Sequence, residues 1–192
     1  MALSRYHRIT RWLHLALAVT VTAQLLLSLV MTPPGGEDPV AALGHGAFEL
    51  HEGFGLAALA VVVIHWLWSA AQGDLGRLFP WGPSGRRAVG EDLRTLSRGR
   101  LLDADPVGGL AGAVHGLGLL AVTAMAFTGL ALFALWPEAG EPGPLAREVG
   151  DVHSAMATLV WIYWFGHVAM AVLHHLAGHN TLRDMFRLGP AG

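Results

Sequence analysis

The sequence predicts an all-α integral membrane protein, a four-helix bundle with both termini in the cytoplasm. Three observations lead to this fold class. Hydrophobic residues make up 53% of the 192 residues and charged residues only 14%, whereas about 25% charged residues is usual in soluble proteins. Four long stretches of the chain contain no Asp, Glu or Arg, and Lys is absent throughout. Finally, eleven of the twelve arginines fall on one side of a membrane that these four stretches would cross.

The uncharged stretches are residues 12–36, 53–73, 106–137 and 152–182. Each contains a run near the ~20 apolar residues that a helix needs to cross a bilayer. We therefore expect spanning helices near 10–31, 50–71, 109–135 and 153–177, in a single transmembrane domain that covers residues 1–192. The first run is too long for the apolar part of a signal peptide, and no clear small-residue cleavage site follows it.

Helix-breaking residues separate these runs. Pro33-Pro34-Gly35-Gly36 is expected to end the first helix, and Trp136-Pro137 the third. The longest connection covers residues 72–108, and we expect a short interfacial helix within it, around Glu91–Leu102.

The arginines predict the orientation of the chain. With four spans, eleven arginines lie on the side of the two termini, and only Arg147 lies on the other side. The positive-inside rule makes the arginine-rich side, with both termini, cytoplasmic. The eight outer acids and Arg147 sum to −7, and the eleven inner arginines with six acids sum to +5. The outer acids are Glu37, Asp38, Glu49, Glu52, Glu138, Glu141, Glu148 and Asp151.

The composition excludes several classes of function. Because Cys is absent, disulfides, thiolate zinc sites, iron–sulfur clusters and covalently attached c-type haem are excluded. A net charge of −2 argues against a nucleic-acid partner. Ion pumps usually need a carboxylate in the middle of a span, and none is present. No nucleophile–base pair or phosphate-binding glycine loop occurs either, so we expect no catalytic side chain.

Histidine is unusually common, with 11 residues, and an ionisable group inside a bilayer is usually functional. His153 and His167 are 14 residues apart, which is about 21 Å along a helix and about 40° short of four turns. That spacing suits two non-covalent b-type haems stacked across the bilayer, each with an imidazole ligand. The histidines in or at the ends of the predicted spans are His14, His51, His65, His115, His153, His167 and His174.

Each haem needs a second histidine at a matching depth. His51 begins the second span on the outer side and matches His153. For the inner haem, His14 and His65 both match His167, and spacing alone leaves both pairings open. Gly55 follows His51 by four residues and would leave room for a porphyrin on the same helix face. For the histidines, the alternative is a structural role in the core, with bonds to neighbouring groups. For the small residues, the alternative is close helix packing, which Gly112-x-x-x-Gly116 also suggests.

Several motifs resemble those of the bacterial cytochrome b561 family, small four-helix diheme proteins of the inner membrane. They begin with Tyr6-His7-Arg8-Ile9-Thr10-Arg11-Trp12-Leu13-His14 and continue with His51 and with His115, fourteen residues before Gly129. They end with His153, His167, His174-His175 and Asn180-Thr181-Leu182-Arg183-Asp184-Met185.

The resemblance implies the axial pairs His14–His167 and His51–His153, with His65 near the edge of the inner haem. It also implies electron exchange with membrane quinone in a respiratory chain. One branch of the family oxidises superoxide with ubiquinone, and others are cytochrome b anchor subunits of hydrogenases or similar dehydrogenases.

The leading interpretation is an electron carrier between an outer-side redox partner and membrane quinone. An acidic outer face repels superoxide and attracts a basic periplasmic redox protein. His174 and His115 are the quinone candidates, since imidazole can supply the protons that a reduced quinone takes up. A superoxide:ubiquinone oxidoreductase and an anchor subunit for a dehydrogenase remain alternatives. A histidine-lined zinc or copper transporter is favoured less, because carboxylates and Cys are lacking.

Overall fold

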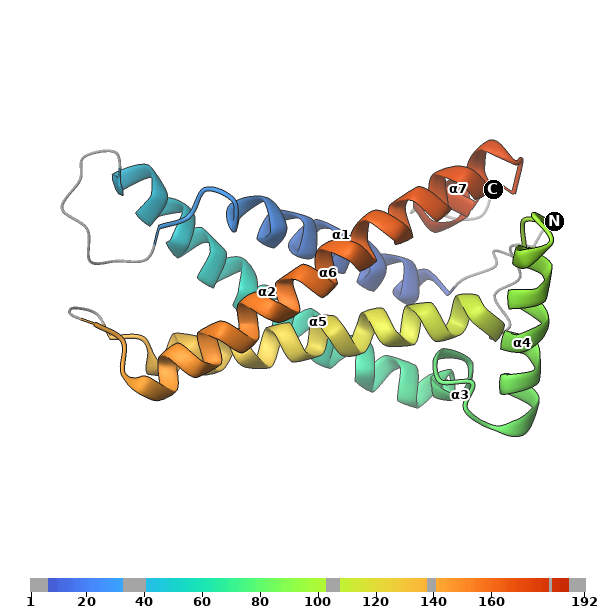
Figure 1. Cartoon of the computed structure of the whole chain (residues 1–192), viewed down its shortest axis with the longest axis horizontal. Coiled ribbons are helices and arrows are strands. Elements are labelled where there is room, and N and C mark those ends of the chain that lie inside the picture. The colour runs from blue at the N-terminus through green and yellow to red at the C-terminus, as the bar shows by residue number, and fades with distance from the viewer. Residues whose placement is uncertain (1–6, 33–40, 103–107, 138–140, 180, 187–192) are drawn as a thin grey trace. The chain divides into compact units, whose positions relative to one another are not determined.

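The computed structural model describes residues 7–32, 41–102, 108–137, 141–179 and 181–186 of the chain. Within these ranges the structure is helical and contains no strand, which confirms the all-α class (Figure 1). The long helices are α1 (Arg8–Leu27), α2 (Ala41–Gln72), α5 (Gly109–Leu135) and α6 (Pro144–Leu176). The short helices are α3 (Leu75–Leu78), α4 (Pro83–Ser97) and α7 (Thr181–Phe186).

Some predicted features lie outside the described residues. They are the breaker Pro33-Pro34-Gly35-Gly36, the charged residues Arg5, Arg187, Glu37, Asp38 and Glu138, and the motif residues Tyr6 and Asn180.

All four long helices are long and apolar enough to cross a membrane, which confirms four candidate spans. Two of them begin earlier than predicted, at Ala41 instead of 50 and at Pro144 instead of 153. The prediction stopped at acidic residues such as Glu49 and Asp151, but a helix can continue into water beyond the bilayer, where charged side chains are hydrated. The first helix ends at Leu27, before the predicted residue 31.

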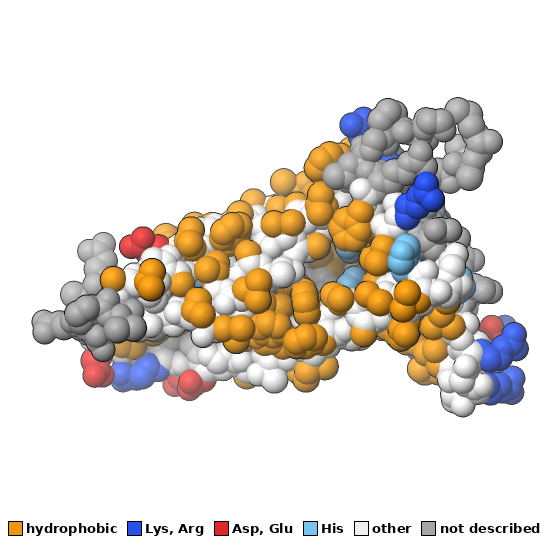
Figure 2. Space-filling model, turned by 90° about the horizontal axis from the view of Figure 1, so that it is seen from above, with side chains coloured by type: hydrophobic (Ala, Val, Ile, Leu, Met, Phe, Trp, Pro, Cys, Tyr) orange, Lys and Arg blue, Asp and Glu red, His pale blue; other side chains and the backbone are white. Residues whose placement is uncertain are grey.

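The surfaces of the long helices are rich in large apolar side chains. Leu67 is 67% exposed, Ile162 65% and Phe165 60%, and Figure 2 shows hydrophobic side chains over much of the visible face. In water such an apolar surface would be an aggregation liability. In a bilayer it is the surface that faces lipid, and helices satisfy their own backbone hydrogen bonds there.

The chain forms two compact units, which are described separately. Unit 1 comprises Met1–His14, Ile64–Leu120 and Tyr163–Gly192, and unit 2 comprises Leu15–Val63 and Ala121–Ile162. Each of the four long helices therefore contributes one segment to each unit.

Unit 2 contains a backbone link between the end of the α1 segment and the start of α2. The amide of Thr32 donates to the carbonyl of Gly44 at 3.0 Å, and a Cβ atom at Gly44 would collide with the Thr32 side chain. Val62 is fully buried, and the rings of Phe48 and Trp136 lie 6.4 Å apart. The absence of a side chain at Gly44 therefore allows the two chain segments to meet closely.

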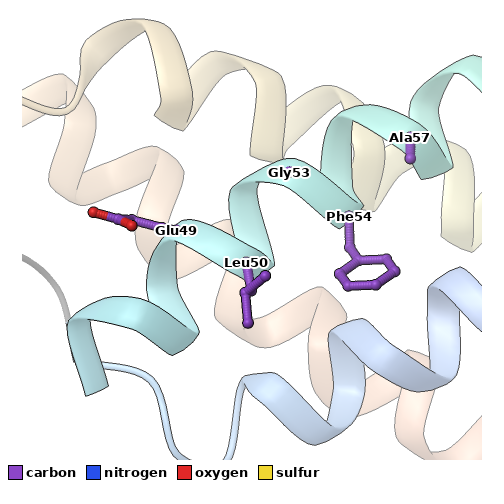
Figure 3. A pocket seen from close by; sticks show the side chains of 5 residues that line it. All are labelled: Glu49, Leu50, Gly53, Phe54 and Ala57. Carbon is purple, nitrogen blue, oxygen red and sulfur yellow. The ribbon is translucent and has the colours of Figure 1, made fainter. Parts of the chain in front are cut away.

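A shallow groove of about 250 Å³ runs along α2 in unit 2. It is lined by Glu49, Leu50, Gly53, Phe54 and Ala57, and Figure 3 shows the side chains of Leu50 and Phe54 on one side of the helix. None of the lining residues is among the site residues predicted from the sequence.

Unit 1 contains the connection between α2 and α5. Helix α2 ends before Gly73, whose φ of 71° lets the amide of Asp74 donate to the carbonyl of Ser69 at 3.0 Å, a common helix-ending turn. A Cβ atom at Gly112 would collide with the Arg77 carbonyl oxygen, and one at Gly116 with that of Leu78. The two glycines thus serve close packing, as the sequence suggested, and their partners are carbonyls of α3.

The structure forms a helix in this connection, α4, which covers Pro83–Ser97 instead of the predicted Glu91–Leu102. Pro83 is suited to the first turn of a helix because its missing N–H would have no partner there. The Asp92 carboxylate accepts a hydrogen bond from the Leu110 amide at 2.8 Å. In this way α4 satisfies one of the free backbone donors at the start of α5.

Candidate functional site

The inner pair of predicted ligands lies in unit 1. His14 comes from α1 and His167 from α6, and their ring centroids are 6.1 Å apart with an interplanar angle of 47°. Both side chains are partly buried. Two helices thus bring together residues that are far apart in the sequence.

The outer pair lies in unit 2 and has similar spacing. His51 comes from α2 and His153 from α6, with ring centroids 6.4 Å apart and planes at 80°. Helix α6 therefore contributes one ring to each pair.

Polar groups that the sequence analysis missed surround the outer pair. The Gln24 amide donates to the backbone carbonyl of His51 at 2.6 Å, and the Thr128 hydroxyl lies 2.8 Å from His153 Nδ1. A Cβ atom at Gly55 would lie 2.9 Å from Gln24 Nε2, so the space beside Gly55 is next to this amide. The available signal was a polar side chain inside an otherwise apolar span.

Aromatic rings surround the inner pair. The His115 ring lies 5.1 Å from that of His167 at 87°, and the Tyr163 ring stacks on His167 at 5.4 Å and 17°. Phe186 of α7 lies 6.0 Å from His14. A Cβ atom at Gly118 would collide with the Tyr163 ring, so this glycine provides the space that Tyr163 occupies beside His167.

His65, the alternative partner for His167, has a different local contact. Its Nδ1 lies 3.2 Å from the hydroxyl of Ser69, one turn along the same helix. Within the described part of the chain, its ring makes no contact with that of His167. This geometry is that of a histidine bonded to its own helix.

His174, one of the two quinone candidates, pairs with another histidine. Gly178 has a φ of 86°, and the His179 amide donates to the His174 carbonyl at 3.0 Å, which ends α6 in a helix-terminating turn. The turn brings His179 Nδ1 to 2.9 Å from His174 Nδ1. The other candidate, His115, is exposed and is in contact with His167.

Comparison with known families gives one match. The family model described as prokaryotic cytochrome b561 matches residues 5–188. The chain belongs to this family. A search of curated proteins found no significant match, and neither did a search of solved structures.

Membership of the prokaryotic cytochrome b561 family, together with the four apolar helices, makes the chain a multi-pass bacterial membrane protein. It also implies a b-type haem and electron transfer in the membrane. The described residues contain no group of three or more His, Cys, Asp or Glu that could hold a metal ion. A haem needs no such group, because its porphyrin supplies four nitrogens and the protein adds only the axial ligands.

The spacing of the two ring pairs fits axial ligands of a haem. Two imidazoles that share one metal ion from opposite sides would have ring centres about 6.2 Å apart, since a metal–nitrogen bond is about 2.0 Å and the ring centre lies about 1.1 Å behind the nitrogen. The observed 6.1 Å and 6.4 Å are close to this separation. The 5.1 Å between His115 and His167 is too short for an iron atom between the rings.

Two of the predicted ligands have a buried ring nitrogen without a partner in the described part of the chain. The buried Nδ1 atoms of His14 and His51 have no hydrogen-bond partner among the described residues. Buried polar atoms without partners are uncommon, and each requires an explanation. One ring of each pair therefore has hydrogen-bonding capacity that the surrounding protein does not use.

Proposed function

We propose that this member of the family is a diheme cytochrome that carries electrons between a redox partner outside the membrane and membrane quinone. His14 and His167 are the axial ligands of the inner haem, and His51 and His153 those of the outer haem. The observation that supports this most directly is the pair of ring separations, 6.1 Å and 6.4 Å. His14 is preferred over His65 because its ring faces His167, whereas His65 contacts Ser69.

A bound haem supplies the one-electron change of its iron. The chain supplies position and environment: the two rings of each pair come from different helices and fix the haem between them. Gln24 holds the backbone at His51 through its 2.6 Å hydrogen bond. Lipid-facing helices keep water away from both pairs, as electron transfer through buried haem requires.

His115 is the preferred quinone-side residue in this proposal. A quinone that accepts two electrons also takes up two protons, and imidazole is suited to deliver them. His115 is exposed and lies against the His167 ring. Its Nδ1 is held 2.7 Å from the Ala111 carbonyl, which leaves Nε2 for a ligand. His174 is the second candidate, since its Nδ1 is already paired with His179.

A basic protein is the outer partner that the charges of unit 2 favour. The described residues of unit 2 carry the acids Glu49, Glu52, Glu141, Glu148 and Asp151. Arg147 is the one basic residue on the predicted outer side, and it lies 3.8 Å from Glu141. Because these five acids outnumber the one basic residue, a superoxide substrate is favoured less than a basic redox protein or a dehydrogenase subunit. The excess of arginines on the opposite side of the predicted spans supports cytoplasmic termini, and the family resemblance implies the inner membrane.

Absorption spectroscopy and haem extraction test the proposal. The purified protein is expected to show a low-spin b-type spectrum and two extractable haems per chain. His14→Ala should lose one haem, and His65→Ala, the matched control on α2, should keep both. A colourless protein, or loss of haem in His65→Ala with retention in His14→Ala, would refute the assignment.

A further inference from the structure

The hydroxyl of Thr128 lies between His153 and the backbone of its own helix. Its Oγ1 is 2.9 Å from the Ala124 carbonyl oxygen, 3.1 Å from that of Met125 and 2.8 Å from His153 Nδ1. A hydroxyl has one hydrogen and two lone pairs. A threonine inside a helix commonly donates that hydrogen to a carbonyl one turn earlier, and the two carbonyl distances here agree with such a bond.

This use of the hydrogen determines the direction of the bond to His153. When Thr128 donates to α5, its oxygen can only accept a hydrogen bond from the ring. Nδ1 of His153 must then carry the hydrogen of the neutral imidazole, and the lone pair is on Nε2. The hydrogen bonds run from His153 Nδ1 to Thr128 Oγ1 and from Thr128 to the Ala124 carbonyl, and each donor has an acceptor.

The next residue of α5 acts on the same ring by its small size. A Cβ atom at Gly129 would lie 3.3 Å from His153 Cε1 and 4.0 Å from Nδ1. The shorter distance is tighter than an ordinary van der Waals contact, so a side chain at this position would push on the ring. Thr128 thus provides a hydrogen bond to one edge of the His153 ring, and Gly129 leaves the space that this edge needs.

We propose that Thr128 is a positioning residue, which fixes the tautomer and the rotation of His153 so that Nε2 faces the outer haem. This proposal rests on the proposed function, because it takes His153 as an axial ligand. His51, the other ring of the pair, has a buried Nδ1 with no described partner. The hydrogen bond to Thr128 makes His153 a more basic ligand than it would be without that bond.

Removal of the acceptor has a defined electronic consequence. A hydrogen bond from the second ring nitrogen makes a histidine more basic, and a more basic ligand stabilises the oxidised iron. Thr128→Val keeps the shape of the side chain and removes the hydroxyl. At a fixed ambient potential it should increase the ratio of reduced to oxidised outer haem on the order of tenfold, which equals 59 mV for a one-electron couple.

The experiment is a redox titration of the full-length protein, with electron paramagnetic resonance of the ferric state. Thr128→Val should raise the midpoint potential of one haem, leave the other unchanged and alter one low-spin signal, because the freed ring rotates. Thr128→Ser keeps the hydroxyl and should restore both readouts. Thr20→Val is the matched control: Thr20 also bonds to carbonyls of its own helix, at 2.8 Å from Ala16, and has no bond to a histidine among the residues that the structure describes.

The outcomes separate this inference from the proposed function. Two haems in the wild-type protein and no change of potential or signal in Thr128→Val would overturn the inference alone, whereas absence of the haems in the wild-type protein would overturn both. An equal shift in Thr20→Val would also overturn it, because the effect would then not depend on His153. If Thr128→Val does not accumulate, Gly129→Ala provides the test: it should alter the same low-spin signal, and an unchanged signal would contradict the proposal.

Discussion

The two histidine pairs have similar ring spacing and different surroundings. In unit 2, His51 and His153 are accompanied by hydrogen-bonding groups, the Gln24 amide and the Thr128 hydroxyl. In unit 1, the rings of His115 and Tyr163 lie against His167 instead. One environment fixes a ring through polar bonds, and the other surrounds a ring with groups that can carry a proton.

This difference suggests a division of roles in the proposed cytochrome. Hydrogen bonds that fix a ligand suit a haem that only exchanges electrons with a protein partner. A cluster that includes an exposed imidazole suits a haem whose electrons leave together with protons. The predictions that follow test this contrast, beginning with the largest expected effect.

The first prediction separates the two pairs by removing their α6 members one at a time. His153→Ala and His167→Ala should each lose one haem, so that the content falls from two haems per chain to one, because each ring belongs to a different pair. Haem extraction and the reduced spectrum measure the loss. His175→Ala on the same helix is the control and should keep both haems. A single substitution that removes both haems would show that the pairs do not bind independently.

The second prediction concerns His115, the proposed proton carrier of unit 1. His115→Phe should keep both haems and slow reduction by a quinol on the order of a hundredfold, since positioned acid–base groups typically contribute at least that much. Stopped-flow measurement of haem reduction tests this, with dithionite as a donor that needs no proton-transfer site. Equal slowing with both donors, or loss of a haem, would contradict a role confined to quinone.

The third prediction perturbs the aromatic contact in unit 1 by a single methyl group. Gly118→Ala places a Cβ atom where the Tyr163 ring lies, and such overpacking costs roughly 1–3 kcal/mol. Thermal unfolding in detergent should show this loss of stability. Gly166→Ala on α6, where a Cβ atom meets nothing within 4 Å, should leave stability unchanged or raise it by up to ~1 kcal/mol, because Ala favours a helix more than Gly does. Similar stability of the two variants would mean that the Tyr163 ring moves away freely.

The smallest expected effect lies farther from the histidines. Asp92→Ala removes the acceptor of the Leu110 amide and should cost about 1 kcal/mol, a usual value for the loss of a helix-capping group. Glu91→Ala removes a neighbouring carboxylate that is exposed, and it should cost less. The same thermal unfolding assay measures both changes in stability. Haem content, as a second readout, should show that both histidine pairs remain intact in the two variants.

The sequence predicted the four spans because charged residues are excluded from lipid, and this rule works well away from the ends of each helix. It misplaced the start of α2 and α6, since helices that leave the bilayer need no apolar pattern. The spacing of His153 and His167 predicted that α6 would contribute to two sites. Spacing could not choose between His14 and His65, because rotation of one helix against another is determined by packing.

Thr128 shows a second limit of prediction from the sequence. A threonine in an apolar span ordinarily bonds to its own helix, and nothing in its neighbours indicates a contact with His153, 25 residues away. Gly118 is similar, because its importance depends on Tyr163, which lies on a different helix. Such contacts become visible only when the helices are placed beside one another.

The contribution of α6 to both ring pairs has a consequence for biosynthesis. Contacts such as the bond between Asp92 and Leu110, 18 residues apart, can form soon after their residues leave the ribosome. The His14–His167 and His51–His153 pairs cannot, because each requires the last long helix to be synthesised. A nascent chain that ends before α6 holds two unpartnered histidines and no complete pair. Haem loading is therefore expected to follow translation, and truncation before α6 should abolish it entirely.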